Sequence, residues 1–203
     1  MLILKNLSGS GDLIAECLRK GGVICFPTET VYALACDATL PNAIARIQKI
    51  KNRDANKPLS LLAYDIKTAK RYVFIDDKAI SVMKKFSPGP ITYILPNKAL
   101  NNWPDFLGIR IPKHPTAQAI LKNYSHLLVG TSVNISGKAS ARTSEEIPEK
   151  IRDCVDIIVN DTPKMPASGL PSTVVDMSMP GRYKILREGP VNKAEIDEIA
   201  DQK

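Results

Sequence analysis

The sequence predicts an α/β fold with a twisted mixed sheet and flanking helices, and two observations support this. Short apolar runs with strand character alternate along the chain with longer segments of helical periodicity, which is the pattern of α/β domains. Of the 203 residues, 44% are hydrophobic, which is enough to bury a sizeable core at this length. Because the chain has no internal repeat, low-complexity tract or clear linker, we expect one domain over residues 1–203.

Helices are predicted where a capping or chain-breaking residue adjoins a segment of helical periodicity. Gly21 and Gly22 favour the end of a first helix, and Pro41 suits the first turn of a second. Asp65 and Asp76 stand where N-caps of two short helices belong. The four longer helices are expected at residues 12–20, 41–51, 116–124 and 193–200. The capping-box pattern at residues 143–146 predicts a further helix, which would have to tolerate Pro148.

Strands are predicted where short apolar runs are bounded by turn residues. These runs lie at residues 23–26, 59–63, 91–95, 108–111, 127–129, 155–159, 173–175 and 185–186. Two long segments between them, residues 96–106 and 162–171, have loop composition. Since loops positioned by a scaffold often carry function, both segments are expected to border a site.

The charge and the cysteines bear on the partners of the protein and on its cellular compartment. Lys and Arg total 28 and Asp and Glu total 21, and the resulting net charge of +7 suits an anionic partner, although solubility explains it equally well. The four cysteines form no CxxC pair and have no neighbouring histidine at metal-ligand spacing, so we expect free thiols in a reducing compartment. The chain begins without a secretory signal pattern and has no apolar run near the ~20 residues that span a bilayer. A cytoplasmic protein without membrane contact is expected.

Several common catalytic motifs are absent. The sequence has no GxxxxGK[ST] phosphate loop, no GxGxxG after a strand and no HExxH metal motif. The two histidines, His114 and His126, are isolated, which argues against a triad or a histidine-based metal site. What remains is a set of hydroxyls, amides, lysines and arginines, which suits the binding and positioning of anions, and no metal ligands are assigned.

Two motifs near the N-terminus are candidates for binding. Thr28, Glu29 and Thr30 directly follow a predicted strand, where ligands of α/β sheets usually bind; the structural alternative is that Thr28 only caps the next turn. Residues 51–53 with Lys57 lie at the end of a predicted helix. Their cationic side chains either bind phosphate or only interact with the negative end of the helix dipole.

Two further motifs lie beyond residue 100. Residues 131–137 alternate hydroxyl and amide side chains and end in glycine, so they either donate to phosphate oxygens or form an ordinary turn. Arg110 lies between two isoleucines in a predicted strand and either faces a carboxylate in a cleft or faces solvent. Arg187 either binds a ligand in a cleft or has a structural role, in which it forms an ion pair with Glu188 or another carboxylate.

Together and in this order, the motifs resemble those of the YrdC family from about Gly21 to Val191. The matching segments are FPTETVYALACDA from 26, the K-x-R element at 51–53, KPLSLL from 57, PGPITYIL from 88, GIRIPKHP from 108, the S-x-N element at 132–134, STVVD from 172 and LREGP from 186. Ala33 and Ala35 stand where the family commonly has glycine, and Leu62 stands where longer members carry histidine. The chain looks like the short, single-domain form.

The resemblance implies an α/β sheet around a basic cleft and an L-threonylcarbamoyladenylate synthase. Such an enzyme forms threonylcarbamoyl-AMP and pyrophosphate from L-threonine, bicarbonate and ATP with Mg²⁺. Its product serves the tRNA t6A37 transferase complex downstream. The resemblance gives Lys51 and Arg53 a catalytic, phosphate-handling role. It further implies nucleotide contacts at Lys57, Ser132, Asn134, Ser140 and Arg187, and threonine contacts at Thr30, Arg110 and Ser172.

Two other functions fit the same residues. One is a non-catalytic RNA-binding protein that uses the basic cleft for tRNA or another RNA, although aromatic residues for base stacking make up only 5% of the chain. The other is a family member acting on a different carbamoyl or amino-acid substrate. The extra methyl groups of Ala33 and Ala35 leave room for this second alternative.

Overall fold

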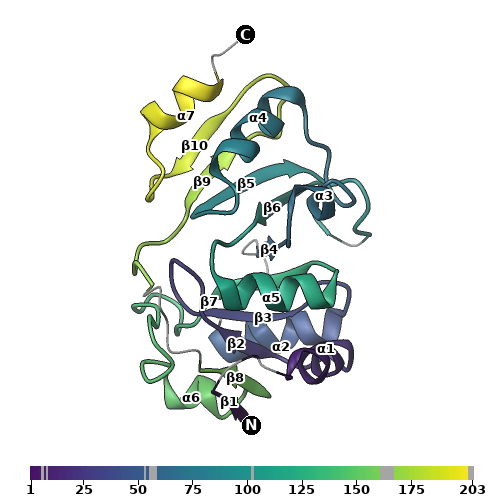
Figure 1. Cartoon of the computed structure of the whole chain (residues 1–203), viewed down its shortest axis with the longest axis vertical. Coiled ribbons are helices and arrows are strands. Elements are labelled where there is room, and N and C mark those ends of the chain that lie inside the picture. The colour runs from purple at the N-terminus through teal and green to yellow at the C-terminus, as the bar shows by residue number, and fades with distance from the viewer. Residues whose placement is uncertain are drawn as a thin grey trace.

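The computed structural model describes residues 1–5, 7, 9–52, 54, 59–101, 103–160 and 167–200. Within these residues ten strands form one sheet in the order β1-β8-β2-β3-β7-β4-β6-β5-β9-β10. The strands are β1 Leu2–Leu4, β2 Ile24–Phe26, β3 Ala33–Asp37, β4 Ser60–Leu62, β5 Ile91–Pro96, β6 Phe106–Arg110, β7 Leu128–Ser132, β8 Ile157–Val159, β9 Thr173–Asp176 and β10 Lys184–Arg187. Figure 1 shows them along the length of the molecule, with β1 at one end and β10 at the other.

The sheet is mixed, as the sequence predicts. The pairs β1–β8, β8–β2, β4–β6 and β5–β9 are parallel. The pairs β2–β3, β3–β7, β7–β4, β6–β5 and β9–β10 are antiparallel. Every predicted strand is present, with small shifts at its ends.

The helices flank this sheet, which confirms the predicted fold class. They are α1 Gly11–Arg19, α2 Pro41–Lys51, α3 Ile66–Ala69, α4 Asp77–Phe86, α5 Pro115–Tyr124, α6 Glu149–Arg152 and α7 Lys193–Ala200. Asp65 and Asp76 are N-caps, because each carboxylate accepts the backbone N–H three residues later at 2.7 Å. Among the described helices, none has the length and apolar character needed to cross a membrane.

The predicted helix start at residues 143–146 is wrong. The Glu146 carboxylate does accept the Arg142 backbone N–H at 2.6 Å, but this bond closes a turn. The helix α6 begins only at Glu149, with Pro148 as its N-cap. The reason is that a residue before proline is sterically disfavoured in the helical region, so no helix continues through Ile147.

Two strands were not predicted. The strand β3 is buried along its whole length, and its sequence ALACD has neither the alternation nor the β-branched residues that mark strands. The strand β1 is a short edge strand beside β8. In addition, β7 continues through Thr131 to Ser132, where a loop was expected.

Side chains alternate between the two faces of the sheet. Along β2, Ile24 and Phe26 pack with residues of α1 and α5, whereas Cys25 belongs to the larger core on the opposite face. That larger core includes buried residues of α2, α4, α6 and α7. Thus α1 and α5 cover their face of the sheet near β8, β2 and β3, and the candidate site lies further along the same face.

Candidate functional site

One face of the central strands forms the floor of a cavity of about 670 Å³. Its floor residues occupy alternate positions on neighbouring, mutually registered strands. They are Ala33, Ser60, Leu62, Thr92, Ile94, Gly108, Arg110, Gly130 and Ser132. Because most of these side chains are small, the sheet itself leaves the space that a ligand needs.

Loops form the walls of the cavity. Residues of both long segments that were expected to border a site line it: Trp103, Pro104 and Phe106 from the first, and Gly169 and Pro171 from the second. The second segment is tied to the turn before β3, because the N–H of Gly169 donates to the Thr30 carbonyl at 2.8 Å. In their described parts, both segments therefore border the cavity.

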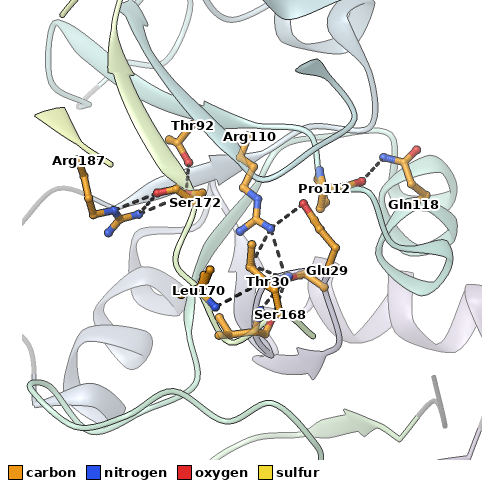
Figure 2. A network of polar contacts seen from close by, with 12 residues as sticks. Glu29, Thr30, Thr92, Arg110, Pro112, Gln118, Ser168, Leu170, Ser172 and Arg187 are labelled. Atoms are coloured by element: carbon orange, nitrogen blue, oxygen red, sulfur yellow. Dashed lines mark hydrogen bonds and ion pairs between the residues drawn. The ribbon is translucent and has the colours of Figure 1, made fainter. Parts of the chain in front are cut away.

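Arg110 faces this cavity and not bulk solvent. Its Nη2 atom donates to Thr30 Oγ1 at 2.7 Å and lies 2.9 Å from Oε1 of Glu29, as Figure 2 shows. The Arg110 and Glu29 side chains are each only 11% exposed. Thr28 caps the turn, since its hydroxyl donates to the Val31 carbonyl at 2.6 Å, and it also lines the cavity.

The pair formed by Glu29 and Arg110 leaves polar atoms unsatisfied. Within the described residues, neither carboxylate oxygen of Glu29 nor Nε of Arg110 has a partner with hydrogen-bond geometry, although all three atoms are buried. The 2.9 Å contact between Nη2 of Arg110 and Oε1 of Glu29 is therefore an ion pair without a well-aligned hydrogen bond. Buried polar atoms without hydrogen bonds destabilise the folded protein unless water or a ligand supplies the missing partners. Glu29 stood in a candidate motif, but only the structure gives it a partner.

A second polar cluster centres on Ser172. Nε and Nη2 of Arg187 donate to the Ser172 carbonyl at 3.0 and 2.8 Å, and Nη2 also donates to its hydroxyl at 3.2 Å. The hydroxyls of Ser172 and Thr92 lie 2.8 Å apart (Figure 2). Within the described residues Arg187 makes no ion pair, so the structural alternative of a salt bridge to Glu188 is not observed. Partial desolvation and the positive charge of Arg110 lower the pKa of Arg187.

The K-x-R and S-x-N elements meet through Lys51. This side chain is 1% exposed, and its ammonium donates to the Ser132 carbonyl and to the Asn134 carbonyl and Oδ1, the last two at 3.1 and 2.7 Å. The Ser132 hydroxyl donates to the same Oδ1 at 2.6 Å. Ser132 lines the cavity, whereas the buried Lys51 is not part of the lining and holds the loop through its hydrogen bonds.

The cavity gathers most of the residues singled out in the sequence. The lining includes Thr30, Arg110, Ser132, Ser140, Ser172 and Arg187. Lys51 and Asn134 contact Ser132, while Arg53 and Lys57 lie outside the described residues. No group of three or more His, Cys, Asp or Glu side chains in the described ranges is arranged to hold a metal ion.

The departures from the family pattern lie on or near the floor. Ala33 lines the cavity, and Ala35 is buried against the cluster of α1 and α5. Both lie in the extended strand β3, so neither position needs the positive φ that glycine allows. An added Cβ at Gly130 would lie 2.5 Å from Cγ of Leu62. Gly130 pairs with Ser60 in the sheet, and the Leu62 side chain occupies the space diagonally across from it, so Leu62 requires glycine at position 130.

Comparisons with known proteins give the family of the chain. The model of the Sua5/YciO/YrdC family, described as "Telomere recombination", matches residues 16–189. A threonylcarbamoyl-AMP synthase from Bos taurus is 33% identical over 185 residues, which cover 87% of this chain and 66% of the bovine one. The uncharacterized protein YciO of Escherichia coli is 32% identical over 181 residues, which cover 86% of each chain.

A solved structure gives the same family. The P. abyssi Sua5 protein complexed with L-threonine superposes with a TM-score of 0.89 at 27% identity, over 98% of this chain and 61% of that one. The present chain thus spans roughly two thirds of the bovine relative's length and less of the P. abyssi protein's. From the family model and these relatives, the chain belongs to the Sua5/YciO/YrdC family.

Proposed function

We propose that the chain is an L-threonylcarbamoyladenylate synthase. It would form threonylcarbamoyl-AMP and pyrophosphate from L-threonine, bicarbonate and ATP, and pass the product to the tRNA t6A transferase complex. The observation that carries the proposal is the convergence, in one cavity, of Arg110 and Thr30 with Ser132 of the S-x-N element. Relatives named threonylcarbamoyl-AMP synthase and the similarity to a protein complexed with L-threonine support it.

The proposed amino-acid end of the cavity lies at Arg110. An amino acid is a zwitterion, and the ion pair of Arg110 with Glu29 presents one charge of each sign at 2.9 Å. The threonine carboxylate would bind the guanidinium, which favours planar bidentate partners. Thr30 and Ser172 would contribute hydroxyl contacts. The buried atoms of Glu29 and Arg110 that lack hydrogen bonds are consistent with a site that a polar ligand completes.

The proposed nucleotide end lies at the S-x-N element. Ser132 and Ser140 line the cavity there, and Asn134 supports Ser132 through its amide oxygen. In this proposal Lys51 contributes by holding that loop, and Arg53 and Lys57 contact phosphate. Mg²⁺ commonly binds substrate phosphates and water more than a protein cage, so the proposal treats it as part of the ATP substrate.

The chemistry needs positioning more than covalent catalysis. Bicarbonate takes up a proton and loses water to give CO2. The threonine ammonium loses a proton, and the resulting amine attacks CO2 and releases a second proton, which gives a carbamate. A carbamate oxygen then attacks the α-phosphorus of ATP, a new P–O bond forms, and pyrophosphate leaves. Binding the three reactants side by side raises their effective concentration and orients them for reaction. Fixed cationic and hydroxyl groups stabilise the negative charge that develops on the phosphate oxygens in the transition state.

Calorimetric titration with L-threonine tests the amino-acid end. Arg110→Ala should weaken binding by about 10-fold or more, because a charge-assisted hydrogen bond is lost. Lys113→Ala is the matched control, since Lys113 is exposed close by in the chain. Equal affinities of the Arg110→Ala variant and the wild type would remove Arg110 from the threonine site.

A turnover assay tests the K-x-R element separately. Arg53→Ala should lower threonine-dependent pyrophosphate release by about 10²-fold or more, as loss of one preorganised charge contact does. A variant with wild-type turnover would show that Arg53 takes no part in the reaction.

A second candidate is the same chemistry with another amino acid. The methyl group of Ala33 and the side chain of Leu62 both lie on the cavity floor and reduce its depth, and the similarity to YciO is comparable to that with the bovine synthase. A panel of amino acids in the pyrophosphate assay distinguishes the two. Turnover with serine or another small amino acid, but not with threonine, would favour this candidate.

A further inference from the structure

Glu29 supplies a negative charge beside the cavity without lining it. Within the described lining the charged side chains are Arg110 and Arg187, and this lining includes no Asp or Glu. The Glu29 side chain is 11% exposed, and its Oε1 atom lies 2.9 Å from Nη2 of Arg110. Figure 2 shows the Arg110 guanidinium between Glu29 on one side and Ser172 on the other. Glu29 therefore contacts Arg110 on the side away from Ser172.

The turn that carries Glu29 is fixed by hydrogen bonds. The backbone carbonyl of Glu29 accepts the N–H of Ser168 at 2.9 Å. The Thr28 hydroxyl donates to the Val31 carbonyl at 2.6 Å and closes the turn. Because the backbone on both sides of Glu29 is held, its carboxylate is fixed next to Arg110 before any ligand binds.

The two terminal nitrogens of Arg110 differ in what surrounds them. Nη2 donates to Thr30 Oγ1 at 2.7 Å and forms the ion pair with Glu29. Nη1 makes no hydrogen bond within the described residues, and it is not among the buried atoms that lack one. Glu29 and Thr30 thus engage one terminal nitrogen and leave the other open to a ligand in the cavity.

The pair of Glu29 and Arg110 changes the charge that a ligand meets. A buried ion pair is weak evidence for stability, since desolvation of both charges offsets their attraction. This pair has no net charge, and neither has a zwitterionic amino acid, whereas the phosphate groups of ATP are anionic. Desolvation and the positive charge of Arg110 lower the pKa of Arg187, so the two guanidinium groups interact. Without Glu29 they would form a doubly positive site of the kind that binds phosphate.

We propose that Glu29 determines specificity, because its charge reserves Arg110 for the amino acid and keeps the phosphates of ATP away from that end of the cavity. The inference rests on the proposed function, in which both substrates share the cavity. Glu29 repels a triphosphate, which carries no compensating positive charge. The ammonium of an amino acid offsets the same repulsion of its carboxylate. Glu29 acts through Arg110 as a positioning residue and disfavours the wrong ligand, which is a common source of specificity.

Calorimetric titration of the full chain with inorganic pyrophosphate tests the proposal. Glu29→Gln keeps the shape of the side chain and removes its charge, so it should bind pyrophosphate about 10-fold or more tightly than the wild type. Glu16→Gln is the matched control, because Glu16 also forms an ion pair, with Lys20, but is exposed. The control should leave the affinity unchanged. An unchanged affinity in Glu29→Gln would overturn the proposal.

A double variant shows whether Arg110 provides the added contact. Glu29→Gln with Arg110→Met removes both charges of the pair, a change that buried ion pairs often tolerate. Its pyrophosphate affinity should equal that of the wild type, in which Glu29 keeps phosphate from Arg110. This comparison decides the question even where Glu29→Gln alone does not fold. Weaker binding by the double variant than by the wild type would show that Arg110 already contacts phosphate, which contradicts the proposal.

Steady-state kinetics separate this inference from the proposed function. In Glu29→Gln the apparent KM for threonine should rise with the ATP concentration, because ATP competes at Arg110, whereas in the wild type it should not. If the pyrophosphate affinities follow the expected pattern but the wild type does not turn over, the proposed function fails and the role of Glu29 stands. If the wild type turns over and its KM for threonine rises with ATP as in Glu29→Gln, the role of Glu29 is wrong.

Discussion

Replacing Lys51 with methionine separates a supporting role from direct catalysis. The lysine side chain is 1% exposed, and its ammonium donates to the Ser132 carbonyl and to two oxygen atoms of Asn134. Methionine keeps a similar length and an apolar stem, so the packing around the stem is largely retained. The substitution therefore removes mainly the donors that hold the S-x-N loop.

The magnitude follows from the three acceptors that lose the ammonium. Oδ1 of Asn134 keeps the Ser132 hydroxyl and the Ser132 carbonyl keeps the Asn134 N–H, so the Asn134 carbonyl is the one left without a donor among the described residues. A buried polar group without a partner costs roughly 1–3 kcal/mol, and these contacts are only partly buried. Relief of the desolvation of the ammonium offsets part of the loss. We expect Lys51→Met to lower the free energy of unfolding by roughly 1–3 kcal/mol, which at about 2–4 °C per kcal/mol lowers the Tm by roughly 2–12 °C.

Thermal and urea unfolding measure this effect, with Lys49→Met as the matched control. Lys49 is exposed on the same helix, so its substitution should change stability by less than about 0.5 kcal/mol. Asn134→Ala should be less than additive with Lys51→Met, because the two residues share a contact. Equal unfolding midpoints for Lys51→Met and Lys49→Met would refute the reasoning and leave Lys51 free for a purely catalytic role.

Three further predictions concern stability and reactivity away from the reaction. Asp76→Ala should cost about 1 kcal/mol in urea unfolding through loss of the N-cap of α4; an unchanged midpoint would deny the cap. Gly130→Ala should destabilise by about 1–3 kcal/mol because its Cβ would lie 2.5 Å from Leu62, and calorimetry showing wild-type Tm would contradict the clash. At pH 8 a thiol reagent should modify exposed Cys154 in the native protein, whereas burial raises the pKa of Cys25 to about 12; rapid native labelling of Cys25 would show that its core opens.

Local signals in the sequence predicted the elements well. The helix at residues 41–51 is observed with the bounds expected from Pro41 and its apolar spacing, and both aspartate N-caps are present. Strand β3 was not predicted, because its small residues carry little strand propensity and are buried throughout. A strand in the middle of a sheet is recognised poorly when neither alternation nor β-branched residues mark it.

The site was predicted in part, because residue types show chemistry but not partners. The position of Arg110 between two isoleucines left open whether it faces a cleft or solvent, and the structure places it on the cavity floor. Its pairing with Glu29 joins residues 81 positions apart, as the two residue numbers show, and no spacing rule predicts such a contact. The contact of Lys51 with the S-x-N loop is equally remote in sequence. These pairings depend on strand order, which single-sequence patterns do not give.

The central claim is tested most directly by pyrophosphate release from the purified protein with ATP and Mg²⁺, with L-threonine and bicarbonate added or omitted in turn. The account predicts release only when both are present, with threonylcarbamoyl-AMP as the accompanying product. Release that is absent, or that does not depend on threonine and bicarbonate, would contradict it.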